Sequence, residues 1–345
     1  MEKLAQVLAG DLSKPYIIAE ISANHNGDFQ NAEKLVLAAK NAGADAVKLQ
    51  TFTADSITVN TKSESYSIPD KSELWAGRNL WELMKEAETP ISWHRELFQF
   101  AKSLGLEAFS TAYDIDSLDF LISEGVNAIK ISSFDLINLP LLQNLADRDV
   151  LVLLSTGMAR SEEIDDAVRI FEHRKSSVGI FQCTSSYPCA LTDVNINRHF
   201  LLKSFGFVTG YSDHTKSSVA SILAVGQGAM IFEKHICLNG VNGLDSDFSL
   251  TPAEFKDYVS CVNDAFKCLG NSEFSPTDSE SASLWERPSL VALTDILIGQ
   301  KLTKANIGVR RPSVGVEPRH LEFLLNRVAN ANLRKGEGIP NSFLR

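Results

Sequence analysis

Strand-like apolar runs alternate with amphipathic helical patterns from the start of the chain to about residue 268. Most of the runs are short and rich in Val, Ile, Leu and Phe, which is typical of parallel strands that are covered on both faces. We expect eight strands, at Tyr16–Ser22, Ala46–Phe52, Leu106–Ala112, Ala128–Phe134, Val150–Thr156, Gly179–Ser185, Phe207–His214 and Met230–Ile236. Helices are expected between and after them, including Gln30–Asn41 (closed by Gly43), His94–Leu104, Ser161–His173, Ser217–Val225 and Pro252–Leu269.

This alternation predicts an α/β fold of the TIM (β/α)8 barrel type. A doubly wound sheet of similar length is the alternative, but it usually has fewer strands. The 345 residues exceed the roughly 250 that such a barrel takes. We expect a barrel domain at residues 1–269, a polar linker at 270–284 and a small β-rich domain at 285–345, which is too small for much core of its own.

Composition limits the partners and the compartment. A net charge of −10 argues against a general nucleic-acid or anionic-membrane surface, because both would repel the chain. The five cysteines are odd in number and form no C-x-x-C pair, which favours reduced thiols in a cytoplasmic protein. The first twenty residues contain no signal-peptide pattern, and no window resembles a membrane span.

Two histidines stand at the ends of neighbouring predicted strands. The stretch 207–236 reads as strand, helix and strand, and it places His214 and His235 at adjacent strand tips on one edge, with Asp213 and Glu233 close by. Two imidazoles leave several coordination positions open, which suits a catalytic Mn²⁺, Mg²⁺ or Co²⁺ ion better than a structural zinc. The alternative is that each histidine only hydrogen-bonds at its strand end.

Lysines lie inside two otherwise apolar strands. Burying Lys48 and Lys130 is costly unless a negative group neutralises them. Ser and Thr residues follow at the strand tips, so we favour a seat for a phosphate and a carboxylate. A Schiff-base lysine of the aldolase type and salt bridges to Glu20 or Asp135 are the alternatives.

The connection from Thr53 to Pro90 is unusually long. It contains Trp75, Arg78 and Trp81, and a loop of this length after a barrel strand is typical of an element that covers the substrate. Simple packing of the tryptophans onto the barrel is the alternative.

With these motifs in order, nearly the whole chain resembles the sialic acid synthase family. The matching segments are IIAEISANHNG, AGADAVKLQT, AIKISSFD, LLSTGM, CTSSYP, GYSDHT and EKH. The C-terminal VRRPSVGVEP and LRKGEGI look like the family's antifreeze-like (SAF) domain. The resemblance implies a metal-dependent enzyme that condenses phosphoenolpyruvate with an N-acetylated amino sugar.

Within the family, TPISWH, WAGRNLWEL and CTSSYP are most similar to pseudaminic acid synthases. In neuraminate and legionaminate synthases a GPD-containing segment typically follows strand eight, and Asn typically stands where this chain has Ser185. Here residues 243–250 read GLDSDFSL, without the proline. Neuraminate or legionaminate synthesis by the same mechanism is the alternative, and a non-catalytic carbohydrate- or ice-binding protein is a more distant one.

The resemblance also implies roles for individual residues. It implies that His214 and His235 bind the metal and that Glu20 handles protons around the attacking water. Phosphoenolpyruvate would be held by Lys48, Lys130, Ser133, Ser155, Ser185 and Ser212. The sugar pocket would be lined by Gln50, Asp135, Tyr187 and Asp245. The family's homodimer is domain-swapped, so Arg311 would reach the sugar of the partner's barrel.

Overall fold

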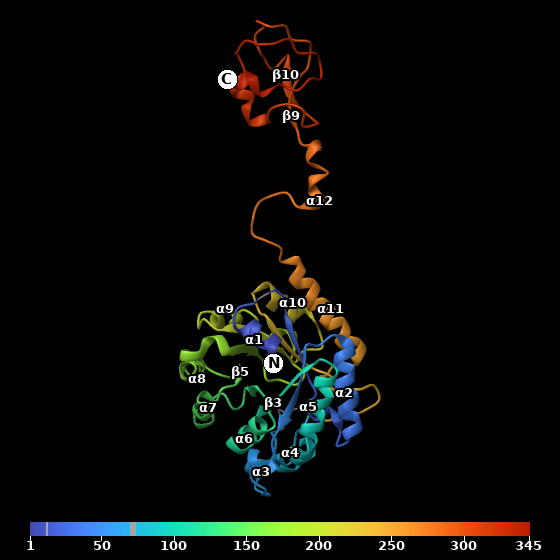
Figure 1. Cartoon of the computed structure of the whole chain (residues 1–345), viewed down its shortest axis with the longest axis vertical. Helices are drawn as coiled ribbons and strands as arrows, with labels where there is room; N and C mark the ends of the chain where they lie inside the picture. Colours follow the sequence, from blue (N-terminus) through green and yellow to red (C-terminus); the bar gives the residue numbers. More distant parts are fainter. Residues whose placement is uncertain (12, 70–73) are drawn as a thin grey trace. The chain divides into compact units, whose positions relative to one another are not determined.

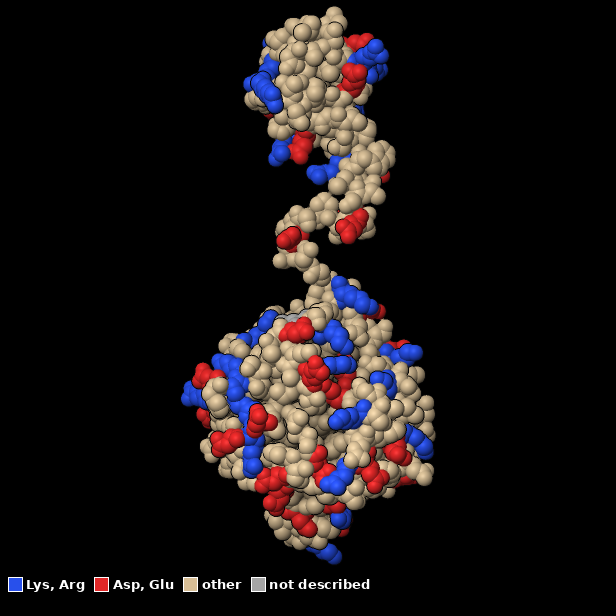
Figure 2. Space-filling view, in the orientation of Figure 1, with Lys and Arg blue, Asp and Glu red and all other residues tan. Residues whose placement is uncertain are grey.

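The computed structural model describes residues 1–11, 13–69 and 74–345. They form two units, Met1–Gly270 and Asn271–Arg345, each of which is described by itself. Among these residues, no helix is both long and apolar enough to cross a membrane. Figure 2 shows acidic and basic side chains interspersed over the visible face of the first unit.

Within the described residues of the first unit, eight parallel strands close into a barrel in sequence order, which confirms the predicted fold (Figure 1). The strands are β1 (Tyr16–Glu20), β2 (Ala46–Thr51), β3 (Glu107–Ala112), β4 (Ala128–Ile131), β5 (Leu151–Ser155), β6 (Val178–Cys183), β7 (Val208–Asp213) and β8 (Ile231–His235). The predicted strands lie in the right places, but several were drawn too long at the carboxyl end. The largest error is β4, which ends at Ile131 because a turn begins at Ser132, where the Asp135 side chain accepts a hydrogen bond from Ser132.

The helices surround the strands and bury their apolar faces against them (Figure 1). The Asp28 side chain caps the first turn of α2 by accepting a hydrogen bond from Gln30 N, and Gly43 ends the helix at φ 93°, as predicted. The helices are α1 (Glu2–Leu8), α2 (Phe29–Ala42), α3 (Ala54–Ile57), α4 (Leu80–Ala87), α5 (His94–Ser103), α6 (Ile115–Ser123), α7 (Leu139–Ala146), α8 (Ser161–Ile170), α9 (Arg198–Lys203), α10 (Val219–Gly226) and α11 (Pro252–Cys268). Short 3₁₀ turns occur at Ser22–His25, Glu64–Tyr66, Ile91–Trp93, Glu172–Ser177, Leu191–Asp193, Leu284–Glu286, Pro318–His320 and Asn341–Leu344.

Helix α1, which we did not predict, precedes the barrel strands. Leu4, Val7 and Leu8 are buried in the same core as the strand residues. The amides of Lys3 and Leu4 donate to the Glu107 carboxylate at the start of β3. The helix therefore packs at the amino end of the strands, opposite the end at which a TIM barrel places its site.

The long connection between β2 and α5 is partly helical, because it contains α3 and α4. Trp81 lies in α4 and donates from Nε1 to Asp55 Oδ1 at 2.8 Å, and Arg78 pairs with Glu86. Capping by Thr53 and Asn79 starts the two helices. These polar contacts join the described parts of the connection that lie around α3 and α4.

The second unit has a core of its own, which includes Leu290, Ile296, Leu302, Ile307 and Ile339. An antiparallel pair, β9 (Ser289–Ala292) with β10 (Ile307–Arg310), runs through it. Two single-turn helices are present, α12 (Asp278–Ser281) in the stretch predicted as a linker and α13 (Leu321–Leu324).

Candidate active site

The carboxyl ends of the barrel strands bring most of the predicted site residues to one end of the barrel. The register fixes this arrangement, because Glu20 pairs with Lys48 on one side and with His235 on the other. Loops that directly follow the strands supply the remainder. The predicted residues placed at this end are Glu20, Lys48, Gln50, Lys130, Ser133, Asp135, Ser155, Ser185, Tyr187, Ser212, His214, His235 and Asp245.

Lys48 and Lys130 are buried in the barrel interior and share carboxylate partners. Lys48 forms an ion pair with Glu20 and lies 3.7 Å from Glu233 Oε1. Lys130 Nζ lies 3.0 Å from Glu233 Oε2. The predicted salt bridge to Glu20 is therefore confirmed, and Lys48 forms it. The predicted salt bridge to Asp135 is wrong, because Lys130 pairs with Glu233 instead. These ion pairs are compatible with anion binding, because an anion accepts hydrogen bonds from the same ammonium groups.

Glu20 and Glu233 differ widely in pKa, although both carboxylates contact Lys48. Burial raises the pKa of Glu20 to about 7 against the pull of Lys48, and the charge of Glu233 adds to the rise. Burial also acts to raise the pKa of Glu233, but Lys130 and Lys48 hold it at about 2. Near neutral pH, Glu233 is thus a fixed anion and Glu20 is able to exchange a proton.

Two serine hydroxyls at this end of the barrel have no hydrogen-bond partner among the residues that the structure describes. Ser155 Oγ and Ser185 Oγ are buried and make no hydrogen bond. Ser133 Oγ accepts from Gly157 N at 3.0 Å. A Cβ on Gly157 would overlap Ser185 Oγ and lie 2.7 Å from Ser133 Oγ, so a larger residue there would displace both serine side chains. Buried hydroxyls without partners are costly, so water or a polar ligand is expected to bind them.

His214 and His235 face each other across β7 and β8, with ring centroids 5.4 Å apart. Nδ1 of His214 lies 2.9 Å from the Thr184 carbonyl oxygen. A carbonyl only accepts, so this nitrogen carries a proton and Nε2 is the nitrogen left to face an ion. Burial acts to lower the pKa of His214, but the Cys183 thiol and the Thr184 carbonyl oxygen bring it above its ordinary value. Nδ1 of His235 lies 3.2 Å from Ser22 Oγ, which orients the second ring. Burial and the neighbouring His214 lower the pKa of His235 well below its ordinary value, which keeps that ring neutral.

This donor set fits a divalent ion that takes its other ligands from water and substrate. Both rings use Nδ1 for orientation, as metal-ligating histidines commonly do, which leaves Nε2 for the ion. Within the part of the chain that the structure describes, no cluster of three or more His, Cys, Asp or Glu side chains is arranged to hold a metal. Two imidazoles alone do not saturate an ion, so an ion held here would keep positions for water and substrate.

Ser22 connects the first strand tip to a metal-ligand candidate. Its φ of 46° is unusual for a residue with a side chain. The conformation lets Ser22 N donate to Glu20 Oε1 at 2.8 Å while Ser22 Oγ contacts His235. Asp245 lies at the same corner, where its carboxylate accepts from Ala23 N at 3.4 Å. Backbone strain at a site of this kind is typical of a functional geometry.

An aromatic wall flanks the two histidines. The Tyr187 ring lies 4.4 Å from the His214 ring, and the Phe248 ring lies 4.9 Å from the His235 ring. Trp75 from the long connection contacts both Tyr187 and Phe248. The contact places Trp75 beside the candidate site, as either interpretation of this connection would have it.

Four residues of this end were given no role from the sequence: Glu233, Gly157, Cys183 and Phe248. The Cys183 thiol lies 3.8 Å from His214 Nδ1. Burial acts to raise the pKa of this thiol, but the imidazole brings it below its ordinary value. Strand alternation was the available signal for Glu233, because it shares the face of His235 two residues later. All five cysteines are free thiols, as predicted.

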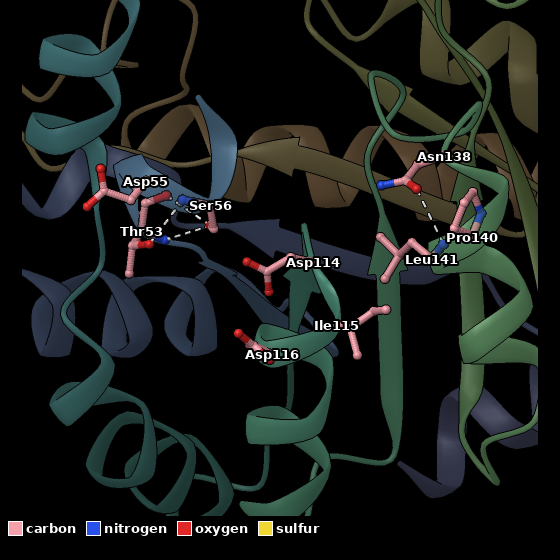
Figure 3. Close-up of a pocket in the computed structure, with 9 residues that line it drawn as sticks. All are labelled: Thr53, Asp55, Ser56, Asp114, Ile115, Asp116, Asn138, Pro140 and Leu141. Carbon is pink, nitrogen blue, oxygen red and sulfur yellow. Dashed lines mark hydrogen bonds between the residues drawn. The ribbon is translucent and has the colours of Figure 1, made fainter. Parts of the chain in front are cut away.

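Two further features share no residue with the strand-tip cluster. Arg311 belongs to the second unit, where it is exposed and lies 3.9 Å from Glu286. A cavity of about 550 Å³ opens between the first turns of α3, α6 and α7 and is lined by Asp55, Asp114 and Asn138 among others (Figure 3). None of the predicted site residues lines it.

The chain is similar to known proteins over most of its length. Residues 35–274 match the NeuB family and residues 287–345 match the SAF domain. The chain is 36% identical to a pseudaminic acid synthase of Campylobacter jejuni over 335 residues, which cover 96% of this chain and 97% of that protein. It is equally 36% identical to an N,N'-diacetyllegionaminic acid synthase of Legionella pneumophila, over 93% of this chain and 92% of that protein.

A solved structure shares the fold as well as the sequence pattern. The N-acetylneuraminic acid synthetase of Leptospira borgpetersenii, in complex with citrate, matches with a TM-score of 0.70 and 32% identity. The match covers 79% of this chain and 91% of that one. These findings confirm the resemblance to the sialic acid synthases, and the chain therefore belongs to the NeuB family, with a SAF domain after its barrel.

Proposed function

We propose that this enzyme is a pseudaminic acid synthase. It would condense phosphoenolpyruvate with a 2,4-diacetamido-2,4,6-trideoxy hexose of the altrose type and water, and it would release a nine-carbon nonulosonic acid and phosphate. The observation that carries this proposal is the group of two buried lysines and two unpartnered serine hydroxyls beside a pair of facing imidazoles. The pseudaminic acid synthases among the relatives support it.

Phosphoenolpyruvate would lie over the lysines. Lys48 and Lys130 supply positive charge in a buried place where an anion interacts strongly with it. The phosphate and carboxylate oxygens would also accept hydrogen bonds from the hydroxyls of Ser133, Ser155, Ser185 and Ser212. Ser212 now donates to Glu233 Oε1 at 3.2 Å, so it is already aimed at the lysine pair.

The reaction needs an electrophile, a water and a proton acceptor. A divalent ion held by Nε2 of His214 and His235, Mn²⁺ before Mg²⁺ or Co²⁺, would polarise the aldehyde oxygen of the open-chain sugar. C3 of phosphoenolpyruvate then forms the new bond to the aldehyde carbon. Glu20 stabilises the cationic character left at C2 and accepts a proton from the water that adds there. The C2–O bond to the phosphate breaks last, which leaves the keto acid and inorganic phosphate.

The sugar would lie between the wall of Tyr187 and the carboxylates of Asp135 and Asp245, with Gln50 at the rim. Burial raises the pKa of Asp245 above its ordinary value, so this side chain suits hydrogen bonding to sugar hydroxyl or amide groups. We further propose a domain-swapped homodimer in which Arg311 of one copy completes the sugar pocket of the other.

Legionaminate synthesis is the second candidate, because a legionaminic acid synthase is as similar to this chain as the pseudaminic acid synthase is. Purified protein should be incubated with Mn²⁺, phosphoenolpyruvate and one candidate hexose at a time, and phosphate release should be measured. We expect release with the altrose-type sugar. Preference for the legionaminate or neuraminate precursor would replace the proposed substrate, and no release with any sugar would favour a non-catalytic protein.

A further inference from the structure

Directly behind the two histidines lies a second pair of charged residues that no step of the reaction uses. Side chains alternate along a strand, so Asp213 and Lys234 point away from the barrel interior toward the helices, while Ser212 and Glu233 point inward. Asp213 and Lys234 are register partners, and the side chains of both are 0% exposed. Helix α10 packs against β7 and against α11, and α10 and α11 lie side by side in Figure 1. Lys234 Nζ lies 5.7 Å from the centroid of the Tyr258 ring on α11.

Every polar atom of this pair has a partner. Lys234 Nζ lies 3.3 Å from Asp213 Oδ1 and also donates to the Thr215 carbonyl oxygen. Asp213 Oδ1 accepts from Thr215 N at 2.8 Å, and Asp213 Oδ2 accepts from Ser221 Oγ at 2.8 Å. Ser221 Oγ in turn lies 2.9 Å from the hydroxyl of Tyr258 on α11. The network joins β7, β8, α10 and α11.

The network ties the backbone on both sides of one imidazole to the other strand. His214 stands between Asp213 and Thr215, and both of these contact Lys234, the residue before His235. The ammonium group thus adds a side-chain link between the two strand tips to the backbone ladder that already pairs β7 with β8. Inward contacts orient each ring, whereas this outward contact restrains the backbone that carries both rings.

Stability alone gives a poor reason for such a pair. A buried ion pair is often matched or exceeded in stability by well-packed apolar side chains of similar volume. Two residues earlier on the same outward faces stand Tyr211 of β7 and Phe232 of β8, and both are buried in apolar packing. The charges are therefore better explained by the geometry that they impose on the strand tips.

We propose that Lys234 and Asp213 are positioning residues that set the spacing of His214 and His235 for the divalent ion. The proposal rests on the proposed function, because it needs the two imidazoles to be the metal ligands. Neither residue touches substrate or ion. Their removal should weaken metal binding while leaving the phosphoenolpyruvate seat, on the opposite face of the strands, intact.

The main test uses the double variant Asp213→Asn, Lys234→Met. Asparagine still accepts from Thr215 N, and methionine keeps the apolar chain beside Tyr258, so both charges disappear together and no unpaired charge stays buried. Metal-stripped protein is titrated with Mn²⁺ alone, and the free ion is followed by its electron paramagnetic resonance signal. We expect a loss of Mn²⁺ affinity of about tenfold or more, as for other groups that orient metal ligands. Phosphoenolpyruvate KM at saturating Mn²⁺ should stay within about twofold of wild type.

Thr209→Val is the matched control. Thr209 lies on the same outward face of β7, four residues before Asp213, and contacts His199 Nε2 at 2.9 Å. The Thr209→Val variant loses a buried hydrogen bond far from the strand tips. Urea midpoints are measured for all variants, and the control should lose stability without losing Mn²⁺ affinity.

The outcomes separate this inference from the proposed function. Wild-type protein that binds none of Mn²⁺, Mg²⁺ and Co²⁺ would overturn both. Wild-type affinity in a folded double variant, or an equal loss of affinity in Thr209→Val, would overturn only the positioning role. Should the double variant fail to fold, Ser221→Ala decides, because it removes one hydrogen bond to Asp213: a weakened Mn²⁺ affinity supports the inference, and an unchanged affinity contradicts it.

Discussion

At the scale of single residues, the site depends on two carboxylates that compete for one lysine. Glu233 is held ionised by Lys130 and Lys48, whereas burial leaves Glu20 with a pKa of about 7. Pairs of titratable groups whose pKa values are driven apart mark the division of acid and base roles in many enzymes. The sequence indicated Glu20 through the family resemblance, but it gave no weight to Glu233. Only the fold shows which of the inward carboxylates contacts which ammonium.

Glu20→Gln should abolish turnover while leaving phosphoenolpyruvate binding largely intact, because the amide keeps the shape but accepts no proton. Turnover is measured by phosphate release and binding by calorimetry. Glu107→Gln is the control, since that carboxylate holds α1 and Tyr16 at the other end of the barrel. Retained turnover in Glu20→Gln would rule out the assigned role.

The pKa of Glu20 also sets a direction for the pH dependence. A proton acceptor must be ionised, so kcat/KM should fall about tenfold per unit as pH drops below about 7. A profile of kcat/KM against pH from 5.5 to 8.5 checks this. A rate that rises toward acid would instead assign Glu20 the role of a proton donor.

At the scale of elements, periodicity located every barrel strand because each is buried on both faces. It failed at the carboxyl tips, where β4 stops at Ile131 and the polar residues that follow turn away. Catalytic residues of a TIM barrel gather at these strand tips. The functional residues therefore stand where the apolar periodicity of the strands is least regular. Long-range partners such as Gly157 with Ser133 and Ser185 have no local signature, because they meet only after the barrel closes.

Gly157→Ala should damage the phosphoenolpyruvate seat without unfolding the barrel. The new methyl group would overlap the Ser185 hydroxyl and crowd Ser133, so we expect KM for phosphoenolpyruvate to rise roughly 10- to 100-fold. Steady-state kinetics with saturating sugar measure the change. Gly226→Ala is the control, because a methyl group at that position on α10 meets no atom within 4 Å.

At the scale of the whole molecule, the barrel unit contains buried histidines that stay neutral. His199 on α9 is fully buried against Thr209 of β7, and burial lowers its pKa from 6.5 to about 4. Burial acts in the same direction on His25, whose pKa is also about 4. A histidine with a depressed native pKa takes up its proton first in the unfolded chain. Acid therefore favours unfolding of the barrel.

Barrel stability should fall as pH drops from about 6.5 to about 4, with a contribution from His199 of up to about 3 kcal/mol. Urea unfolding followed by circular dichroism at pH 7 and pH 4.5 measures this loss. His199→Gln should reduce the difference between the two pH values, whereas His173→Gln, at an exposed position, should leave it unchanged. An equal pH dependence in wild type and His199→Gln would contradict the assignment.

The packing of Trp75 against Tyr187 and Phe248, tilted to the first ring and edge-on to the second, has a practical use. An indole in that position senses the same neighbourhood as the imidazoles, so its emission should change when small molecules arrive there. Trp75 fluorescence should therefore report binding at this site. The Trp75→Phe variant identifies which part of the emission comes from Trp75 and which from the other tryptophans.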